Sequence, residues 1–89
     1  VKMSIINYTE EEFKHRKSLG KRIVELRHQY GLTQKELADK VKIASRSLSE
    51  IENGKCCPNA IIVYRIAKAL DMTLFEFYEF KEEPKVSIE

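Results

Sequence analysis

The sequence contains only three glycines, and they do not cluster, so it has no glycine-rich loop of the kind that cradles phosphates. A serine elbow and a carboxylate cluster are also missing, and we therefore expect no enzyme activity. No apolar run approaches the ~20 residues that a membrane-spanning helix needs, so no membrane partner is expected. The opening residues lack the charged start and apolar stretch of a signal peptide, which favours a cytoplasmic location.

Cysteine is scarce as well, because the two cysteines are the adjacent residues Cys56 and Cys57. Neighbouring cysteines seldom bond to each other, since the ring that they would close is strained, and no disulfide framework is expected. Combined with His15 and His28, they lack the C-x-x-C spacing of zinc sites, so we expect no metal and no other cofactor. Two alternatives stay open for the thiols: they are inert, or their oxidation shifts Lys55.

The charge is unevenly distributed along the chain. Its 89 residues are enough for one domain, and the net charge of +2 is an average over three unlike regions. Residues 13–68 carry 13 Lys and Arg against 5 Asp and Glu, whereas residues 1–12 and 69–89 have net charges of −2 and −4. A basic centre is typical of a phosphate-binding surface, and the alternative is an ordinary solvated helical surface.

Apolar residues recur at helical spacing in five segments, and strands are nearly absent from the pattern. The sequence therefore predicts an all-α domain over residues 9–80, with a loose arm at residues 1–8 and a polar tail at residues 81–89. Three of the helices begin with a threonine followed three residues later by a glutamate, the pattern of a capping box. The expected helices run from Thr9 to about Tyr30, from Leu32-Thr33 to Lys40 or Val41, from Ser45 to Asn53, from Pro58-Asn59 to about Leu70, and from Leu74 to about Phe80.

Two glycines carry information about the first helix. Gly20 interrupts good helix formers at a cost of ~1 kcal/mol relative to alanine, which suggests that another helix passes close by. Gly31 is expected to end this helix in a left-handed conformation. The inward positions are expected to be Leu19, Ile23, Leu26 and Tyr30 in this helix, and Leu37, Ala38, Val41, Leu48, Ile51, Ile62, Val63, Ile66, Ala67 and Leu70 in the next three.

The second and third helices are short and joined by about three residues, the geometry that places a recognition helix in a DNA groove. The stretch 32–70 strongly resembles the Cro/repressor, or Xre-type, helix-turn-helix family, and the resemblance extends over about residues 18–80. The matching residues are Leu32-Thr33-Gln34, Leu37-Ala38, Leu48, Ile51-Glu52, Gly54, Pro58, Ile66-Ala67 and Ala69-Leu70, together with Leu19-Gly20-Lys21-Arg22-Ile23 and Leu26-Arg27 upstream.

This resemblance implies a five-helix repressor-like fold and a structural ion pair between Arg27 and Glu52. The sequence departs from the family pattern at Lys42, where the turn commonly has glycine. If the backbone is left-handed there, lysine adopts it at a cost of about 1 kcal/mol. In return, Lys42 would bring a positive charge close to phosphate.

By its position, the start of the third helix is expected to reach the bases, with Ser45, Arg46, Ser49 and Glu50 facing outward. Arg46 is the strongest candidate, because a guanidinium fork matches guanine O6 and N7 in the major groove. Glu50 has two interpretations: it accepts from cytosine N4, or it is the i,i+4 partner of Arg46 and holds that fork in place.

Backbone contacts are expected from residues that flank the two helices. The resemblance implies that Gln34, at the positive end of the second helix, holds a phosphate; the alternative is an ordinary polar first-turn residue. Asn53 and Lys55 follow the third helix, at a place where members of the family also contact the DNA backbone. Asn53 can cap the helix and make such a contact at the same time. Together with Lys42, these residues make up the predicted phosphate contacts.

Apolar residues stand where the family pattern is usually polar, namely Ile61 and Phe75, with Tyr78 and Phe80 close by. We expect a homodimer through these residues, reading an inverted-repeat site in double-stranded DNA as a repressor. Coverage of the patch by the arm or the tail is the alternative. A different class of function is a controller protein of a restriction–modification system or an antitoxin-type protein that also binds a protein partner.

Overall fold

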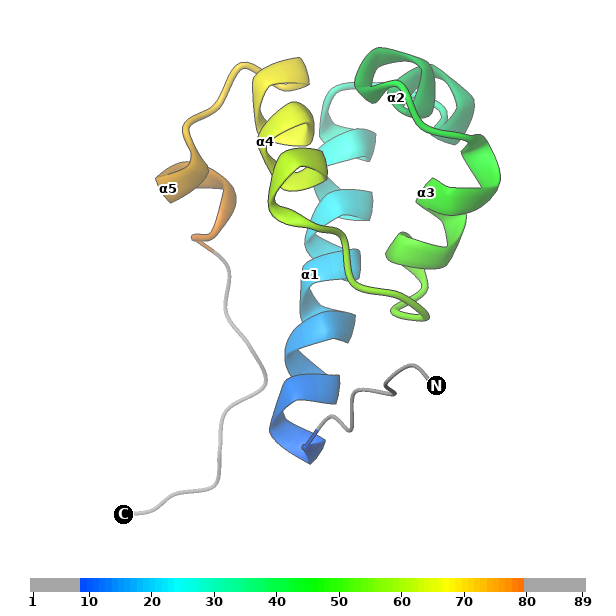
Figure 1. Cartoon of the computed structure of the whole chain (residues 1–89). Helices are drawn as coiled ribbons and strands as arrows, with labels where there is room; N and C mark the ends of the chain where they lie inside the picture. The colour runs from blue at the N-terminus through cyan, green and yellow to red at the C-terminus, as the bar shows by residue number, and fades with distance from the viewer. Residues whose placement is uncertain (1–8, 80–89) are drawn as a thin grey trace.

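The structure, a computed structural model, describes residues 9–79 and contains five α-helices and no strand over this range (Figure 1). These helices are α1 (Glu10–Gln29), α2 (Gln34–Val41), α3 (Ser45–Glu52), α4 (Ala60–Ala69) and α5 (Leu74–Phe77). The prediction of an all-α, five-helix fold is therefore confirmed. The predicted arm and tail, residues 1–8 and 81–89, lie outside the described residues.

Short-range hydrogen bonds fix where most of the helices begin. The three predicted capping boxes are present, each with reciprocal bonds of 2.8 to 3.1 Å between a threonine and the glutamate three residues later. Asn59 caps α4 by accepting from the backbone nitrogen of Ile62 at 2.9 Å. Helix α3 differs, because its N-cap residue is Ala44 and no side chain caps it. Its first N–H groups are left for another partner.

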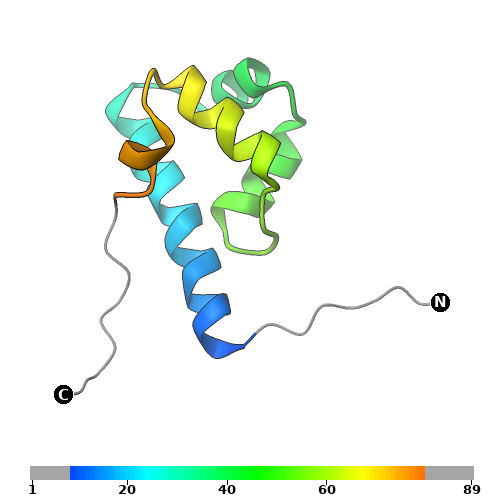
Figure 2. The same ribbon diagram turned by 60° about the vertical axis from the view of Figure 1, so that its left-hand side comes forward.

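Helix α3 packs against both α1 and α2, and α4 packs against both α2 and α5 (Figure 1). Figure 2 shows α5 beside α1. The core forms where these helices meet, and Phe77 is its largest fully buried side chain. No described helix is long and apolar enough to cross a membrane. The buried apolar residues are Leu19, Ile23, Leu26, Leu37, Ala38, Val41, Leu48, Ile51, Val63, Ile66, Ala67, Leu70 and Phe77.

At Gly20, α3 passes close to α1, as the sequence predicts. A β-carbon at this position would lie 2.5 Å from the carbonyl oxygen of Ile51 and 2.6 Å from that of Glu52. These distances are too short for any side chain, so the glycine lets the C-terminal end of α3 rest directly on α1. The left-handed conformation predicted for Gly31 is also present, with a φ of 66°.

Two expectations near helix ends are wrong. Tyr30 was expected on the buried face, but its side chain is 49% exposed because the residue lies beyond the last turn of α1, as its C-cap. Helix α5 was expected to reach about Phe80 but ends at Phe77. Two carbonyls at this end accept from Arg22 of α1: its Nε donates to the carbonyl of Phe77 at 3.1 Å and its Nη2 to that of Glu76 at 2.9 Å. A continuing helix would offer these carbonyls to its own N–H groups.

Replacing Gly20 by alanine tests the close approach. Helix propensity alone would stabilise the protein by about 1 kcal/mol. The contact with α3 predicts the opposite sign, a loss of roughly 1–3 kcal/mol in the free energy of unfolding, measured by urea denaturation. Gly31→Ala is the control, because its β-carbon would meet nothing within 4 Å and costs only the left-handed backbone. An increase in stability for Gly20→Ala would show that the two helices are not in contact there.

Candidate nucleic-acid interface

A buried carboxylate holds α3 in place. The side chain of Glu52 is 4% exposed and that of Arg27, on α1, is 12% exposed. The guanidinium donates twice to the carboxylate, from Nε to Oε2 at 2.8 Å and from Nη2 to Oε1 at 3.1 Å. Its third nitrogen, Nη1, donates to the carbonyl of Leu32 at 3.1 Å. The geometry is that of the ion pair expected between Arg27 and Glu52, and it links α1, the turn before α2 and the end of α3.

Gln34 joins the same cluster. Its Nε2 donates to Oε1 of Glu52 at 2.8 Å, and the side chain is half-buried. An amide nitrogen has two N–H donors, and this bond uses one of them. Sequence reasoning did not predict this bond, because the two residues are 18 positions apart and only the tertiary fold brings them together. The phosphate contact expected of Gln34 stays a prediction, and the second N–H of its side-chain amide is the donor that would make it.

The outward flank of α3 is polar and exposed. Its inward flank is occupied by Leu48, Ile51 and Glu52, which are buried. Arg46 points away from the core with a side chain that is 88% exposed, and its Nε lies 3.6 Å from Oε2 of Glu50. The i,i+4 pairing that the sequence allowed for Glu50 is thus present. Such a pair holds the guanidinium fork near one position without burying it.

The turn between α2 and α3 contains the residue that departs from the family pattern. Lys42 has φ and ψ of 61° and 46°, the left-handed region, and it ends α2 as its C-cap. Its side chain is exposed at the junction of the two helices. A lysine accepts this conformation at a cost of about 1 kcal/mol, while the turn keeps the three-residue length that the sequence predicts.

The loop after α3 presents Asn53 and Lys55 to solvent. Asn53 is the C-cap residue of α3, and its Nδ2 donates to the carbonyl of Ser49 at 2.9 Å. Between them Gly54 is buried, and a β-carbon there would lie 2.8 Å from Cγ of Lys17. The loop therefore rests directly on α1.

The two cysteines lie in this loop and differ in exposure. Cys57 is exposed, whereas Cys56 is partly buried against the core. Burial raises the pKa of the Cys56 thiol, and the negative charge of Glu50 raises it further, while Arg16 acts in the opposite direction. The Cys56 thiol therefore forms the reactive thiolate less readily than an ordinary cysteine. No group of three or more metal-ligating side chains occurs among the residues that the structure describes.

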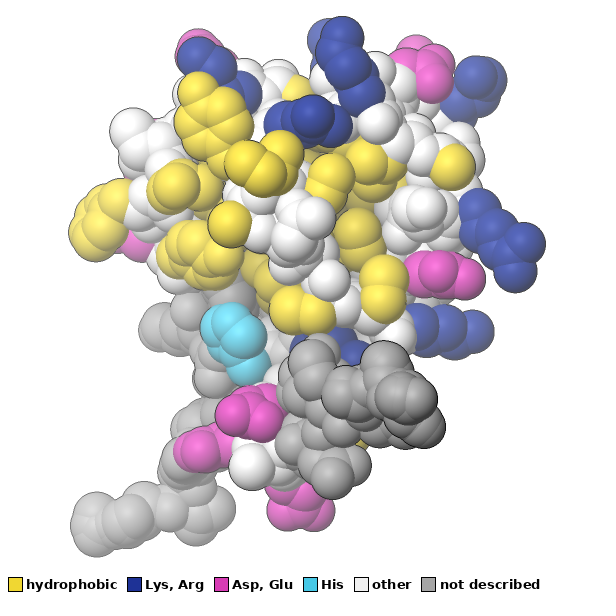
Figure 3. Space-filling model, in the orientation of Figure 1, with side chains coloured by type: hydrophobic (Ala, Val, Ile, Leu, Met, Phe, Trp, Pro, Cys, Tyr) yellow, Lys and Arg dark blue, Asp and Glu magenta, His cyan; other side chains and the backbone are white. Residues whose placement is uncertain are grey.

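Figure 3 shows apolar side chains gathered over α4 and α5, with Lys and Arg side chains along the margins over α2 and α3. Three of the residues predicted for a dimer interface are exposed on these two helices or at the end of α5: Ile61 is 57% exposed, Phe75 76% and Tyr78 45%. The fourth, Phe80, lies outside the described residues. Sequence reasoning missed Tyr64 and Leu74, which are 50% and 44% exposed. The spacing of Tyr64, one helical turn after Ile61, is a signal that could have indicated it.

Residues 20–80 match the family described as helix-turn-helix domain, and this stretch is more than half of the chain. The chain belongs to the helix-turn-helix domain family. An uncharacterized HTH-type transcriptional regulator of Archaeoglobus fulgidus is 36% identical over 62 residues, which is 70% of this chain and 89% of that one. The HTH-type transcriptional regulator PuuR of Escherichia coli is 32% identical over 65 residues, covering 73% of this chain and 35% of its own length.

Solved helix-turn-helix structures have the same fold. The restriction–modification controller protein C.AhdI from Aeromonas hydrophila superposes with a TM-score of 0.69 at 26% identity, over 72% of this chain and 97% of that one. The N-terminal DNA-binding domain of SinR from Bacillus subtilis gives 0.65 at 29% identity, over 73% and 96%. The predicted family is confirmed, and the chain is a transcriptional regulator with a helix-turn-helix fold.

Removing the Glu52 carboxylate tests whether the buried ion pair organises this helix-turn-helix. Glu52→Ala leaves the Arg27 guanidinium buried without its counter-charge, and we expect the free energy of unfolding to fall by roughly 3–5 kcal/mol in urea denaturation. Glu52→Gln keeps an acceptor oxygen and should lie between this variant and the wild type. Glu25→Ala, which removes an exposed carboxylate from α1, is the control and should change stability by about 0.5 kcal/mol or less. Equal losses for Glu52→Ala and Glu25→Ala would contradict the organising role.

Proposed function

We propose that this helix-turn-helix protein binds double-stranded DNA sequence-specifically, with α3 in the major groove. The observation that carries the proposal is the division of α3 into a buried flank and a free polar flank. Leu48 is fully buried, while the Arg46 side chain on the opposite flank is 88% exposed. The uncapped first turn of α3 supports the same orientation, since free N–H groups and the positive dipole end favour an anionic partner.

Sequence is read by the outward residues of α3. Arg46 donates two hydrogen bonds to guanine O6 and N7, and Glu50 keeps the guanidinium fork in position from one turn further along. Ser45 and Ser49 lie on the same helix and contact a neighbouring base edge or a phosphate through their hydroxyls. These four residues are the proposed base contacts.

The DNA backbone is held on both sides of α3. Lys42 and Lys55 bring exposed ammonium groups to the two ends of the helix, and Asn53 lies beside Lys55. Gln34 contacts a phosphate through the amide N–H that Glu52 does not use. Such contacts position the protein without reading sequence.

The regulator acts as a symmetric homodimer through the apolar surface of α4 and α5. Ile61, Phe75 and Tyr78 are exposed there, and Tyr64 and Leu74 enlarge the surface that a monomer would leave in water. Phe80 belongs to the same proposed interface. Two copies of α3 then lie one DNA turn apart, about 34 Å, and read an inverted repeat. Bound at such a site, the dimer represses transcription.

A specific observation also favours a second, related role. The chain superposes on 97% of C.AhdI, which is a restriction–modification controller protein. A controller of this kind uses the same DNA-binding surface, and an antitoxin-type protein would in addition use the apolar surface for a different protein. Recovery of a stoichiometric second protein with the tagged chain from its native host would favour the antitoxin role over the homodimer.

Selection of bound sites from random duplex DNA tests the proposal, followed by Arg46→Ala. We expect the selected sites to form an inverted repeat. Loss of the guanidinium fork should then relax the preference at one base pair per half-site, at a cost of ~1–3 kcal/mol in binding free energy. Lys40→Ala removes the same charge from an exposed position of α2 and should leave the preference intact. An unchanged preference with Arg46→Ala would refute its assignment, and the absence of any enriched sequence would refute the function.

Phe75→Glu tests the dimer. A carboxylate at the centre of an apolar interface is costly to bury, so the variant should sediment as a monomer at concentrations at which the wild type is a dimer. It should also lose affinity for the full inverted repeat much more than for a half-site. The monomer should stay folded, because this side chain is 76% exposed. Tyr30→Glu, at an exposed position at the end of α1, is the control. A dimeric Phe75→Glu protein would place the interface elsewhere.

A further inference from the structure

The first half of α1 projects past the other described helices (Figure 1). Ten residues of this helix precede Gly20, where α3 crosses it, and they correspond to about 15 Å of helix. Most of their side chains are exposed. Packing in the hydrophobic core therefore does not explain why α1 extends this far before Gly20.

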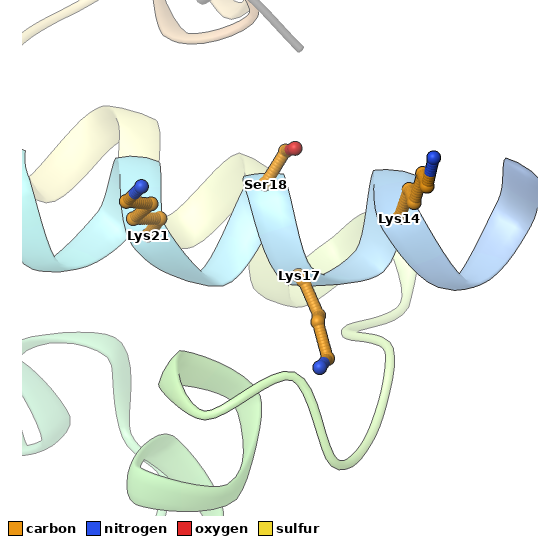
Figure 4. Close-up of a pocket in the computed structure, with 4 residues that line it drawn as sticks. All are labelled: Lys14, Lys17, Ser18 and Lys21. Atoms are coloured by element: carbon orange, nitrogen blue, oxygen red, sulfur yellow. The ribbon is translucent and has the colours of Figure 1, made fainter. Parts of the chain in front are cut away.

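After the acidic first turn of α1, a basic face begins in this projecting part and continues past Gly20. Lys14, Lys17, Ser18 and Lys21 line one shallow hollow on its surface (Figure 4). The spacing of three and four residues brings the lysines to the same side of the helix. Within residues 9–79 the three ammonium groups take part in no ion pair, in contrast to Lys35, which pairs with Asp39, and Arg46, which pairs with Glu50.

The basic face is continuous with the loop that follows α3. The stem of Lys17 lies against Gly54, with its Cγ 2.8 Å from where a β-carbon would be, and Figure 4 shows the side chain directed toward that loop. Lys55, a proposed phosphate contact, is the next residue along the loop. A DNA backbone that passes over Lys55 therefore meets Lys17, and Lys14 and Lys21 lie one turn to either side of it.

We propose that Lys14, Lys17 and Lys21, with the hydroxyl of Ser18, form a second phosphate-binding surface for the same DNA duplex. They hold the backbone outside the base pairs that α3 reads. The three lysines span about 10 Å of helix, and phosphates of one strand recur every ~3.4 Å along the DNA axis, so the surface reaches two or three of them. The hollow is lined by Lys and Ser alone, and the exposed Phe13 of the same part of α1 is not among its lining residues.

This inference rests on the proposed function, and the test separates the two. Wild type, Lys14→Gln/Lys21→Gln and Lys40→Gln/Lys68→Gln are each titrated with the selected duplex over 50 to 200 mM salt. Both double variants lose two positive charges, the control from α2 and α4. Each lost phosphate contact lowers the slope of log affinity against log salt by about 0.9. The slope should therefore fall by about two for the α1 variant and stay near the wild-type value for the control.

A second measurement locates the contact on the DNA. Extending the duplex by half a turn beyond each end of the selected site should raise the affinity of the wild type and of the control much more than that of the α1 variant, which keeps only Lys17 of the three lysines. Thermal unfolding checks that all three proteins are folded. If the wild type binds the duplex and both double variants have the same slope of log affinity against log salt, the second phosphate-binding surface is wrong. The proposed function would still stand. A wild type that binds no duplex would overturn both.

Discussion

The position of α3 depends on the carboxylate of Glu52. This group is nearly removed from water, which costs several kcal/mol unless donors replace the lost hydration. The donors come from two other helices, Arg27 on α1 and Gln34 on α2. Because the carboxylate itself belongs to α3, satisfying it fixes all three helices relative to one another. The glycine at position 20 completes the arrangement by letting the end of α3 touch α1.

Because α3 is held in this position, its polar flank is separated from the apolar surface of α4 and α5. Once Leu48, Ile51 and Glu52 face inward, the remaining side chains of α3 face outward and are polar. Most of the large apolar side chains that stay exposed lie on α4 and α5 or directly after α5 (Figure 3), while Phe13 and Tyr30 are exposed on α1 and at its end. Self-association and DNA binding therefore need not compete for the same residues. Arg22 supports the apolar surface of α4 and α5, since it holds the end of α5 against α1 through two backbone carbonyls.

Much of this structure could be predicted from the sequence because its signals are local. A capping box needs a threonine and a glutamate three residues apart, and a close helix crossing needs a glycine at one position. The bond from Gln34 to Glu52 and the two bonds from Arg22 to α5 could not be predicted, since they join residues 18 to 55 positions apart. Periodicity also fails in a helix of four residues: it does not distinguish the buried Phe77 from the exposed Phe75.

The outward flank of α3 is the surface proposed to contact DNA. An amide chemical-shift titration of the isotope-labelled protein with the selected duplex tests it most directly, because every described helix reports separately. Binding through α3 predicts the largest shifts in Ser45–Glu52 and in the loop to Lys55, and small shifts at Ile61 and Phe75. Large shifts confined to α4 and α5, with α3 unmoved, would contradict it.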